Sequence, residues 1–288
     1  MQWNMDMRFD ASRGIVYGTA STLLLMLFVT WAAAQNSDTT NVDLCNGKGR
    51  SSPESQIAGC TALIKEGGDN SKLLTNAYNN RGNAHAGNGE FDQAIEDYDE
   101  AIKLNPNYTK ALNNRGVAYE KAGDYDRAIK DFDAAINIDP NYSVALANRA
   151  ETFQKRGDYP SALKDFDQAI QLQPTLRALW NERCWTHAIV GELQAALADC
   201  NEAIRLEPNV AATFDSRGFT YLKLGQWDLA IADYNSALQI EPKLPSALYG
   251  RGFAKLKKAD RTGGNADIAA AEVVQRNIAG EFARYGLH

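Results

Sequence analysis

The four cysteines are the residues of this sequence best suited to covalent chemistry, and they form two pairs of similar spacing. The stretch of chain between Cys45 and Cys60 is nearly as long as that between Cys184 and Cys200. Neither pair has the Cys-x-x-Cys spacing of a thiol-redox motif, and only three histidines are present to complete a metal site. In an exported chain, an even count with matched spacing favours two disulfide bonds, each stabilising by about 2–4 kcal/mol. A redox pair and a metal site are the alternatives.

No set of residues has the spacing of an active site. His85 and His187 fall where other units of the repeat described below carry tyrosine or phenylalanine, so we interpret them as packing residues. Gly263 and Gly264 form a turn without the strand–helix junction of a phosphate loop. The carboxylates are spread along the chain rather than gathered. We therefore predict no catalytic residue, no metal ligand and no cofactor.

Two rows of opposite charge recur at one fixed period along the chain. An anion-binding stripe of arginines is one interpretation, but equal numbers of arginine and aspartate at fixed spacing favour pairs that satisfy each other's charge. The net charge of −6 supplies no basic face for nucleic acid, so we expect no direct nucleic-acid binding. The arginines are Arg81, Arg115, Arg149, Arg183, Arg217 and Arg251. The aspartates are Asp97, Asp131, Asp165, Asp199, Asp233 and Asp267.

The elements that must position these residues are copies of one 34-residue unit, seen most clearly in Asn105–Pro140. Each unit predicts two helices, at about positions 1–14 and 18–31. Glycine at position 15 ends the first helix and proline at position 32 ends the second. Small residues at positions 8, 20 and 27 let the helices approach, and large residues at positions 4 and 24 fill the remaining space. Five full units span 75–108, 109–142, 143–176, 177–210 and 211–244.

This combination of period and residue types resembles the tetratricopeptide repeat, over residues 75–244. The resemblance implies an all-α fold, a right-handed α-solenoid of stacked helix-turn-helix hairpins with degenerate, capping end units. It also implies a concave groove lined by positions 2, 5, 6, 9, 12 and 13 of each first helix. Mapped onto this sequence, the peptide-groove residues are Asn79, Asn80, Asn83, Asn113, Asn114, Asn148, Asn181, Trp185, Phe219, Tyr249 and Phe253. The alternative is that the asparagines bridge helices and the phenylalanines pack between units.

The two ends of the chain depart from the repeat. We interpret residues 35–74 as a polar lead followed by an atypical helical unit that carries the first cysteine pair. Residues 245–288 read as a degenerate sixth unit in which Arg276 replaces the terminating proline. We expect Phe282 and Tyr285 to cover the exposed end of the stack.

Residues 1–34 are different again. Arg8 and Arg13 precede an uncharged apolar stretch, and three alanines at 32–34 follow it. This pattern predicts a signal peptide over residues 1–34 and an exported protein of the periplasm or extracellular space. An uncleaved membrane anchor over residues 14–34 is the alternative.

Taken together, these features predict an exported, bacterial-type tetratricopeptide repeat protein that binds a protein or peptide partner without catalysis. The expected role is that of a scaffold or adaptor of the cell envelope. A membrane-tethered assembly factor for an envelope complex is one alternative, and a thiol-redox or hydrolytic enzyme is another.

Overall fold

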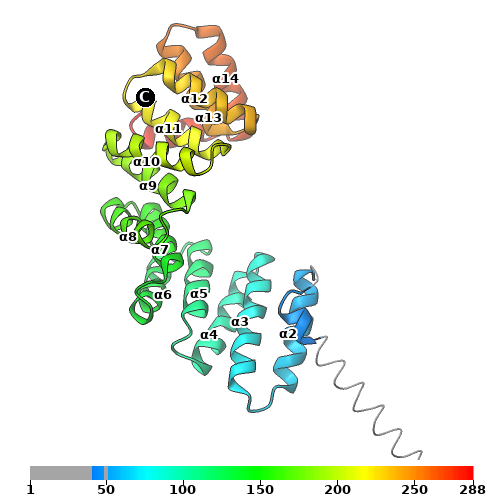
Figure 1. The fold of residues 1–288 in the computed structure, drawn as a ribbon. Helices are drawn as coiled ribbons and strands as arrows, with labels where there is room; N and C mark the ends of the chain where they lie inside the picture. Colours follow the sequence, from blue (N-terminus) through cyan, green and yellow to red (C-terminus); the bar gives the residue numbers. More distant parts are fainter. Residues whose placement is uncertain (1–40, 49–50, 288) are drawn as a thin grey trace, which may run out of the picture.

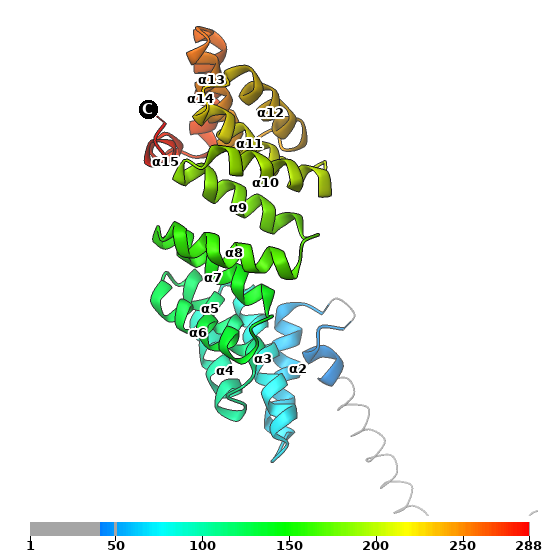
Figure 2. The same ribbon diagram turned by 60° about the vertical axis from the view of Figure 1, so that its left-hand side comes forward.

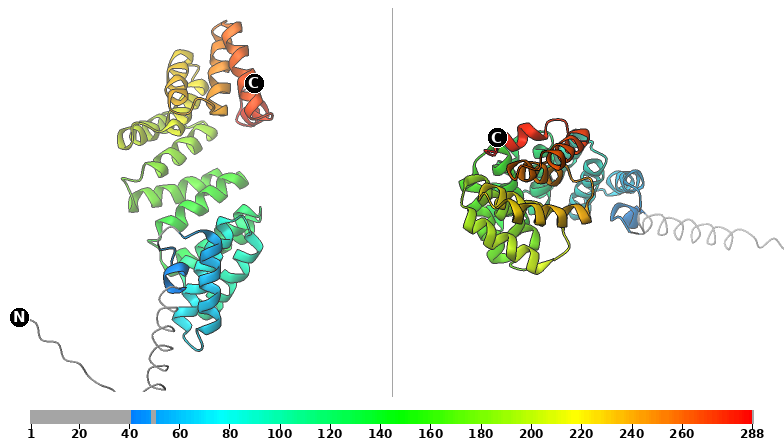
Figure 3. Two further views of the ribbon diagram at one scale, coloured as in Figure 1. Left: turned by 90° about the vertical axis from the view of Figure 1, so that its right-hand side faces the viewer. Right: turned by 90° about the horizontal axis from the view of Figure 1, so that it is seen from above.

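The computed structural model describes residues 41–48 and 51–287, and within them it contains helices and turns but no strand. The predicted signal peptide and anchor lie outside the described residues. Successive helical hairpins stack side by side into a right-handed α-solenoid that runs from α2 (Pro53–Glu66) at one end to α14 (Arg261–Val274) at the other (Figure 1). Seen along its length, the stack winds around a central axis (Figure 3). Because each hairpin packs mainly on its neighbours, the core is a row of clusters rather than one centre, and the largest cluster runs from Cys184 to Leu287.

Each unit supplies a first helix and a second helix. The first helices are α3 (Ser71–Gly87), α5 (Thr109–Lys121), α7 (Ser143–Arg156), α9 (Arg177–Val190), α11 (Ala211–Lys223) and α13 (Pro245–Lys257). The second helices are α4 (Phe91–Leu104), α6 (Tyr125–Ile138), α8 (Tyr159–Leu172), α10 (Leu193–Leu206), α12 (Trp227–Ile240) and α14 (Arg261–Val274). A helical stretch over 41–45 and α2 (Pro53–Glu66) precede them, and α15 (Ile278–Arg284) follows. The interpretation of Gly263 and Gly264 as a turn is wrong, since both lie within α14 and Asp260 caps its start.

The turns follow the glycines of the sequence, with one exception. Position 15 has a positive φ in every full unit, for example 83° at Gly123 and 90° at Gly191. In the last unit the same position is Ala259, which adopts φ 67° although its Cβ disfavours this region. The second helices begin at position 17, one residue earlier than predicted. The residue at position 16 acts as the N-cap, as when the Asp124 side chain accepts the Arg127 amide.

Small and large residues pack as the repeat pattern predicts. A Cβ added at Gly116 would lie 2.7 Å from Cε1 of Phe132, so only glycine fits against that ring. Phe132 and the position-20 alanine, Ala128, are fully buried. In the unit 177–210 this glycine–aromatic contact is replaced by the disulfide between Cys184 and Cys200.

The structure contains both disulfides that the sequence predicts. Cys184 joins Cys200 between α9 and α10, and Cys45 joins Cys60 at the start of the stack. All four sulfur-bearing side chains are buried, and the described residues include no free cysteine. Each bond therefore holds together one helix pair where the sister units rely on an aromatic ring.

The rows of arginine and aspartate pair with each other, which is the structural interpretation preferred from the sequence. Nε and Nη2 of Arg149 donate to the carboxylate of Asp165 at 2.7 and 2.8 Å, and Nη1 donates to Asp133 of the preceding unit at 2.6 Å. The same two-oxygen pairing joins the other five arginines to the aspartate 16 residues later. The bidentate pairs join the two helices of one unit, and the Nη1 bond joins neighbouring units, so these arginines are structural rather than an anion site.

After α14 the chain turns back instead of extending the stack. α15 packs against α13 and α14 (Figure 2), and its aromatic side chains reach the rings of Trp185 on α9 and Phe219 on α11. Phe282 and Ile278 are buried there. We expected Phe282 and Tyr285 to cover the end of the solenoid. Their rings instead pack against aromatic residues of the first helices α9, α11 and α13, namely Trp185, Phe219 and Tyr249.

Candidate functional site

The concave face is built by the first helices and divides into two halves of different chemistry. The N-terminal half carries the asparagines predicted to face a ligand, and the C-terminal half carries the aromatic residues. Most of these side chains are engaged within the chain itself. The packing described below favours the alternative interpretation for them, in which they bridge helices and units, and their contact with a ligand stays a prediction.

The asparagines of the N-terminal half hydrogen-bond to one another. Nδ2 of Asn114 donates to Asn79 at 3.2 Å and to Asn83 at 2.9 Å. Nδ2 of Asn148 donates to Asn113 at 2.9 Å, and Nδ2 of Asn80 donates to Asn46 at 3.1 Å. We call this set the asparagine ladder; its members are Asn46, Asn79, Asn80, Asn83, Asn113, Asn114 and Asn148.

The asparagine ladder bridges neighbouring units instead of forming a row of free amides. Asn79 and Asn113 are each only 4% exposed. Asn83, which is exposed like Asn46, also accepts a hydrogen bond from the Tyr98 hydroxyl at 2.8 Å. A side-chain amide at position 6 reaches the amide at position 5 of the unit before it, so each satisfies the other's buried polar atoms.

The aromatic residues of the C-terminal half are covered by α15. The Trp185 ring lies 4.6 Å from that of Phe219 and 5.3 Å from that of Tyr285. The Tyr249 ring lies 4.7 Å from that of Phe282. Phe219 is 1% exposed and so is not available to a partner in this state.

Phe253, predicted as a groove residue as well, is also buried at 9% exposure. The alternative stated from the sequence, that Phe219 and Phe253 pack between units, therefore describes them better than a ligand contact does. Of the aromatic set, Trp185 and Tyr249 keep partial exposure beside α15.

Asn181 differs from the other position-5 asparagines. Asn79 and Asn113 each accept an amide from position 6 of the next unit, but the corresponding residue after Asn181 is Ser216. The Ser216 hydroxyl donates to the Ala212 carbonyl instead. Oδ1 of Asn181 is consequently buried without a partner in the described structure.

Asn181 lies in the wall of a cavity of about 290 Å³ between α9, α11, α13 and α15, which we call the polar cavity. Oδ1 of Asp215 is also buried there without a partner in the described part of the chain, while Oδ2 accepts the Ser246 hydroxyl at 2.7 Å. Burial raises the pKa of Asp215 to about 7, and nearby Glu241 adds to the effect. Other lining residues are Glu182, Trp185, Glu281 and Tyr285.

A second hollow of about 190 Å³ adjoins the polar cavity and shares Glu182 with it. Its wall is mostly apolar, and Val144 and Leu176 leave 47% and 45% of their surface exposed. We call it the apolar socket; it is lined by Val144, Ala147, Leu176, Ala178 and Leu179, with Glu151 and Glu182 at its side. Burial raises the pKa of Glu182 and of Glu151, and a neighbouring glutamate adds to each shift.

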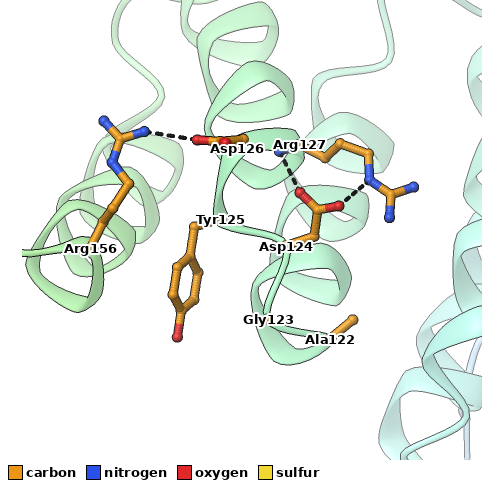
Figure 4. A pocket seen from close by; sticks show the side chains of 7 residues that line it. All are labelled: Ala122, Gly123, Asp124, Tyr125, Asp126, Arg127 and Arg156. Carbon is orange, nitrogen blue, oxygen red and sulfur yellow. Dashed lines mark hydrogen bonds and ion pairs between the residues drawn. The ribbon is translucent and has the colours of Figure 1, made fainter.

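A larger open hollow lies at the turn between α5 and α6, and its charges are already paired (Figure 4). Arg127 bonds to Asp124, and Arg156 lies 3.0 Å from Asp126.

His85 and His187 are engaged as well. Nδ1 of His85 lies 2.6 Å from the carboxylate of Glu90, and Nδ1 of His187 lies 2.6 Å from that of Glu192. Within residues 41–48 and 51–287, no group of three or more His, Cys, Asp or Glu is arranged to hold a metal ion.

Sequence reasoning missed Asp215, Glu182 and the whole of the apolar socket. A signal for Asp215 was present, because position 5 is asparagine in three units and aspartate only here. Its isolation from cations depends on the fold, however, and could not be found from the unit alone. None of the helices in the described residues is long and apolar enough to cross a membrane.

Comparison with known families agrees with this architecture. Residues 79–143 and 143–176 match profiles described as tetratricopeptide repeat, and residues 218–258 match one described as TPR repeat. The chain is a tetratricopeptide repeat protein. The three matched segments lie within the hairpins described above, from α3 to the end of α13.

Solved tetratricopeptide repeat proteins share the fold at low sequence identity. One from Parabacteroides merdae has a TM-score of 0.68 at 19% identity, covering 87% of this chain and 99% of that one. YrrB, described as a TPR protein with an unusual peptide-binding site, has a TM-score of 0.55 at 21% identity, covering 67% and 97%. Pseudomonas aeruginosa pilF has a TM-score of 0.63 at 16% identity, covering 75% and 99%. No curated protein matches the sequence.

Proposed function

We propose that this tetratricopeptide repeat protein is a non-enzymatic scaffold or adaptor that binds a protein or peptide segment along its concave groove. The observation that carries the proposal is the apolar socket on that face. Val144 and Leu176 present apolar surface to solvent in a hollow large enough for one side chain of a partner. Exposed apolar surface gathered in a concavity is typical of a binding site rather than of a solvated face.

The position of α15 supports the same function. A helix with Ile278, Phe282 and Tyr285 on one face already lies in the C-terminal half of the groove. The groove therefore accommodates a helical segment with apolar anchors three and four residues apart, which is a common mode of peptide recognition. A partner segment reaches the apolar socket beside α15, or takes the place of α15 itself. YrrB, with its peptide-binding site, gives a precedent within the fold.

The envelope assignment rests on the cysteines. Two buried disulfides persist in oxidising compartments, and with the N-terminal pattern they favour an exported protein of the periplasm or extracellular space. A membrane-tethered assembly factor remains the second candidate, because the uncharged segment 14–34 is long enough to act as an anchor. The mass of the mature N-terminus distinguishes the two.

The test replaces one exposed apolar residue in the apolar socket and a matched one elsewhere. Val144 on α7 is 47% exposed, and Leu229 on the second helix α12 is 48% exposed. Peptides selected for binding to the wild-type chain should lose affinity about tenfold or more with Val144→Asp, because a carboxylate is desolvated in the socket. Leu229→Asp should bind them as the wild type does. Equal loss in both variants, or in neither, contradicts binding at the apolar socket.

Trp185 and Phe219 are unsuitable for this test. Their replacement by alanine would remove the surface on which α15 packs. A change in binding would then report the loss of α15 as much as the loss of a contact with the partner.

A further inference from the structure

The polar cavity contains buried acceptors that no donor in the described structure satisfies. Oδ1 of Asn181 and Oδ1 of Asp215 are both fully covered and both without a hydrogen bond. Asn181 is 6% exposed and so belongs to the interior. Leaving buried acceptors unmatched is unfavourable, and such atoms are expected to meet a donor. Two acceptors in one cavity favour a group that carries several N–H bonds.

The charges around the cavity favour a positively charged group. Glu182, Asp215 and Glu281 all line it. Besides burial, the groups that influence the ionisation of Asp215 are the hydroxyl of Ser246 and the carboxylate of Glu241. Neither group is a cation. When Asp215 is ionised, its side of the cavity therefore carries negative charge that no cation on the neighbouring elements compensates.

The cations near the cavity act on its other two carboxylates. The positive charges of Arg177 and Lys155 favour the ionised form of Glu182. Arg284 lies 4.0 Å from Glu281. The cavity is thus partly neutralised at Glu182 and Glu281, which leaves the Asp215 side as the place for a further positive charge.

Aromatic rings form another wall. The Trp185 and Tyr285 rings meet edge to face, 5.3 Å between centroids and 81° between planes. The face of an indole or phenol ring attracts an organic cation, most strongly when water is excluded. Carboxylates, an unpaired amide oxygen and aromatic faces together match a guanidinium or ammonium group, which offers N–H donors in several directions.

We propose that the polar cavity binds the cationic head of an arginine or lysine side chain, carried by the segment held in the groove. This inference rests on the proposed groove function and names the chemistry of the bound segment. The apolar socket lies next to the polar cavity, with Glu182 in the wall of both. The preferred segment accordingly places an apolar side chain close to a basic one.

The first experiment measures binding of single residues to the full chain. N-acetyl-arginine amide and N-acetyl-lysine amide are titrated, with N-acetyl-citrulline amide as the neutral counterpart of arginine. The indole N–H signal of Trp185 in two-dimensional NMR reports occupation of the cavity. The arginine or the lysine compound should bind at least about tenfold more tightly than citrulline, as expected for a charge-assisted hydrogen bond. Equal binding of all three, or no shift of the Trp185 signal by any, overturns the proposal.

The second experiment removes one acceptor at a time. Asp215→Asn keeps the shape of the side chain and should weaken binding of the cation about tenfold. Asn181→Leu should do the same; should it fail to fold, Asp215→Asn decides alone. Asp92→Asn, on the exposed face of α4, changes the net charge equally and should have no effect. Undiminished binding in Asp215→Asn overturns the proposal.

The two proposals fail separately. Peptides whose binding depends on Val144 but is unchanged when their arginine and lysine are replaced by citrulline and glutamine would leave the groove function standing and remove the cation site. Loss of the Val144 dependence alone would remove the groove function, while the single-residue titration would still report on the cavity.

Discussion

The buried carboxyl of Asp215 makes the stability of the C-terminal units depend on pH in a predictable direction. Its pKa is raised from 3.8 to about 7 in the folded chain. Between these two values the folded state holds a proton that the unfolded state has released. Folding is therefore progressively less favourable as pH rises from about 4 to about 7, and the loss is constant above that range.

The magnitude follows from the size of the shift. A displacement from 3.8 to about 7 is roughly three pKa units, and each unit corresponds to about 1.4 kcal/mol. The full penalty at pH 8 is thus at most about 4 kcal/mol, and partial exposure of the residue to water lowers it. Asp215→Asn removes the titrating group, and its amide oxygen can still accept the Ser246 hydroxyl.

We expect Asp215→Asn to be more stable than the wild type by about 2–4 kcal/mol at pH 8 and nearly equal to it at pH 4. Urea unfolding at a series of pH values, followed by amide hydrogen exchange in α11 and α13, measures the difference locally. Glu151 and Glu182 also have raised pKa values, but they are common to both proteins and cancel in the comparison. Asp92→Asn serves as the control at an exposed site. A stability difference that is the same at pH 4 and pH 8 would refute the reasoning.

Three further changes test the architecture. Replacing Cys45 and Cys60 by alanine should lower the stability of the first unit by about 3 kcal/mol through lost loop closure, and α2 amides should exchange before those of other helices; uniform exchange along the chain would contradict this. Ala259→Gly should raise the thermal stability by about 1 kcal/mol because φ 67° is unfavourable for alanine, and a lower melting temperature would count against it. Gly116→Ala should cost about 1–3 kcal/mol in urea unfolding, since its Cβ would lie 2.7 Å from Phe132; an unchanged midpoint would show that the ring moves freely.

The stacked hairpins could be predicted from the sequence because their determinants are local and repeated. Glycine at the first turn, alanine within the second helix and an aromatic ring opposite a glycine recur at fixed positions, and each acts within one unit or on its neighbour. The cysteine pairs were predictable for the same reason. Cys184 and Cys200 replace a glycine–aromatic pair whose members touch in the sister units, as Gly116 and Phe132 do.

The groove was harder to predict because its side chains form contacts with more than one unit. Asn114 has the position of a ligand-facing residue, yet its amide reaches Asn79 and Asn83 of the preceding unit. No single repeat contains that information. The course of α15 was likewise unpredictable from residues 275–277, because loss of the terminating proline permits either a longer helix or a reversal. Only packing against Trp185 and Tyr249 favours the reversal.

The same argument explains why the two halves of the groove differ. Where asparagine occupies positions 5 and 6 of successive units, the amides satisfy one another and the units are bridged. Ser216 occupies position 6 of the unit after Asn181, so no side-chain amide reaches Asn181 from there. Its Oδ1 is therefore left buried without a partner in the described structure. Trp185 and the residues of α15 then form the rest of the cavity wall. The ladder thus ends where residues other than asparagine occupy positions 5 and 6, as at Ala147, Glu182 and Ser216, while the hairpins that support it are unaltered.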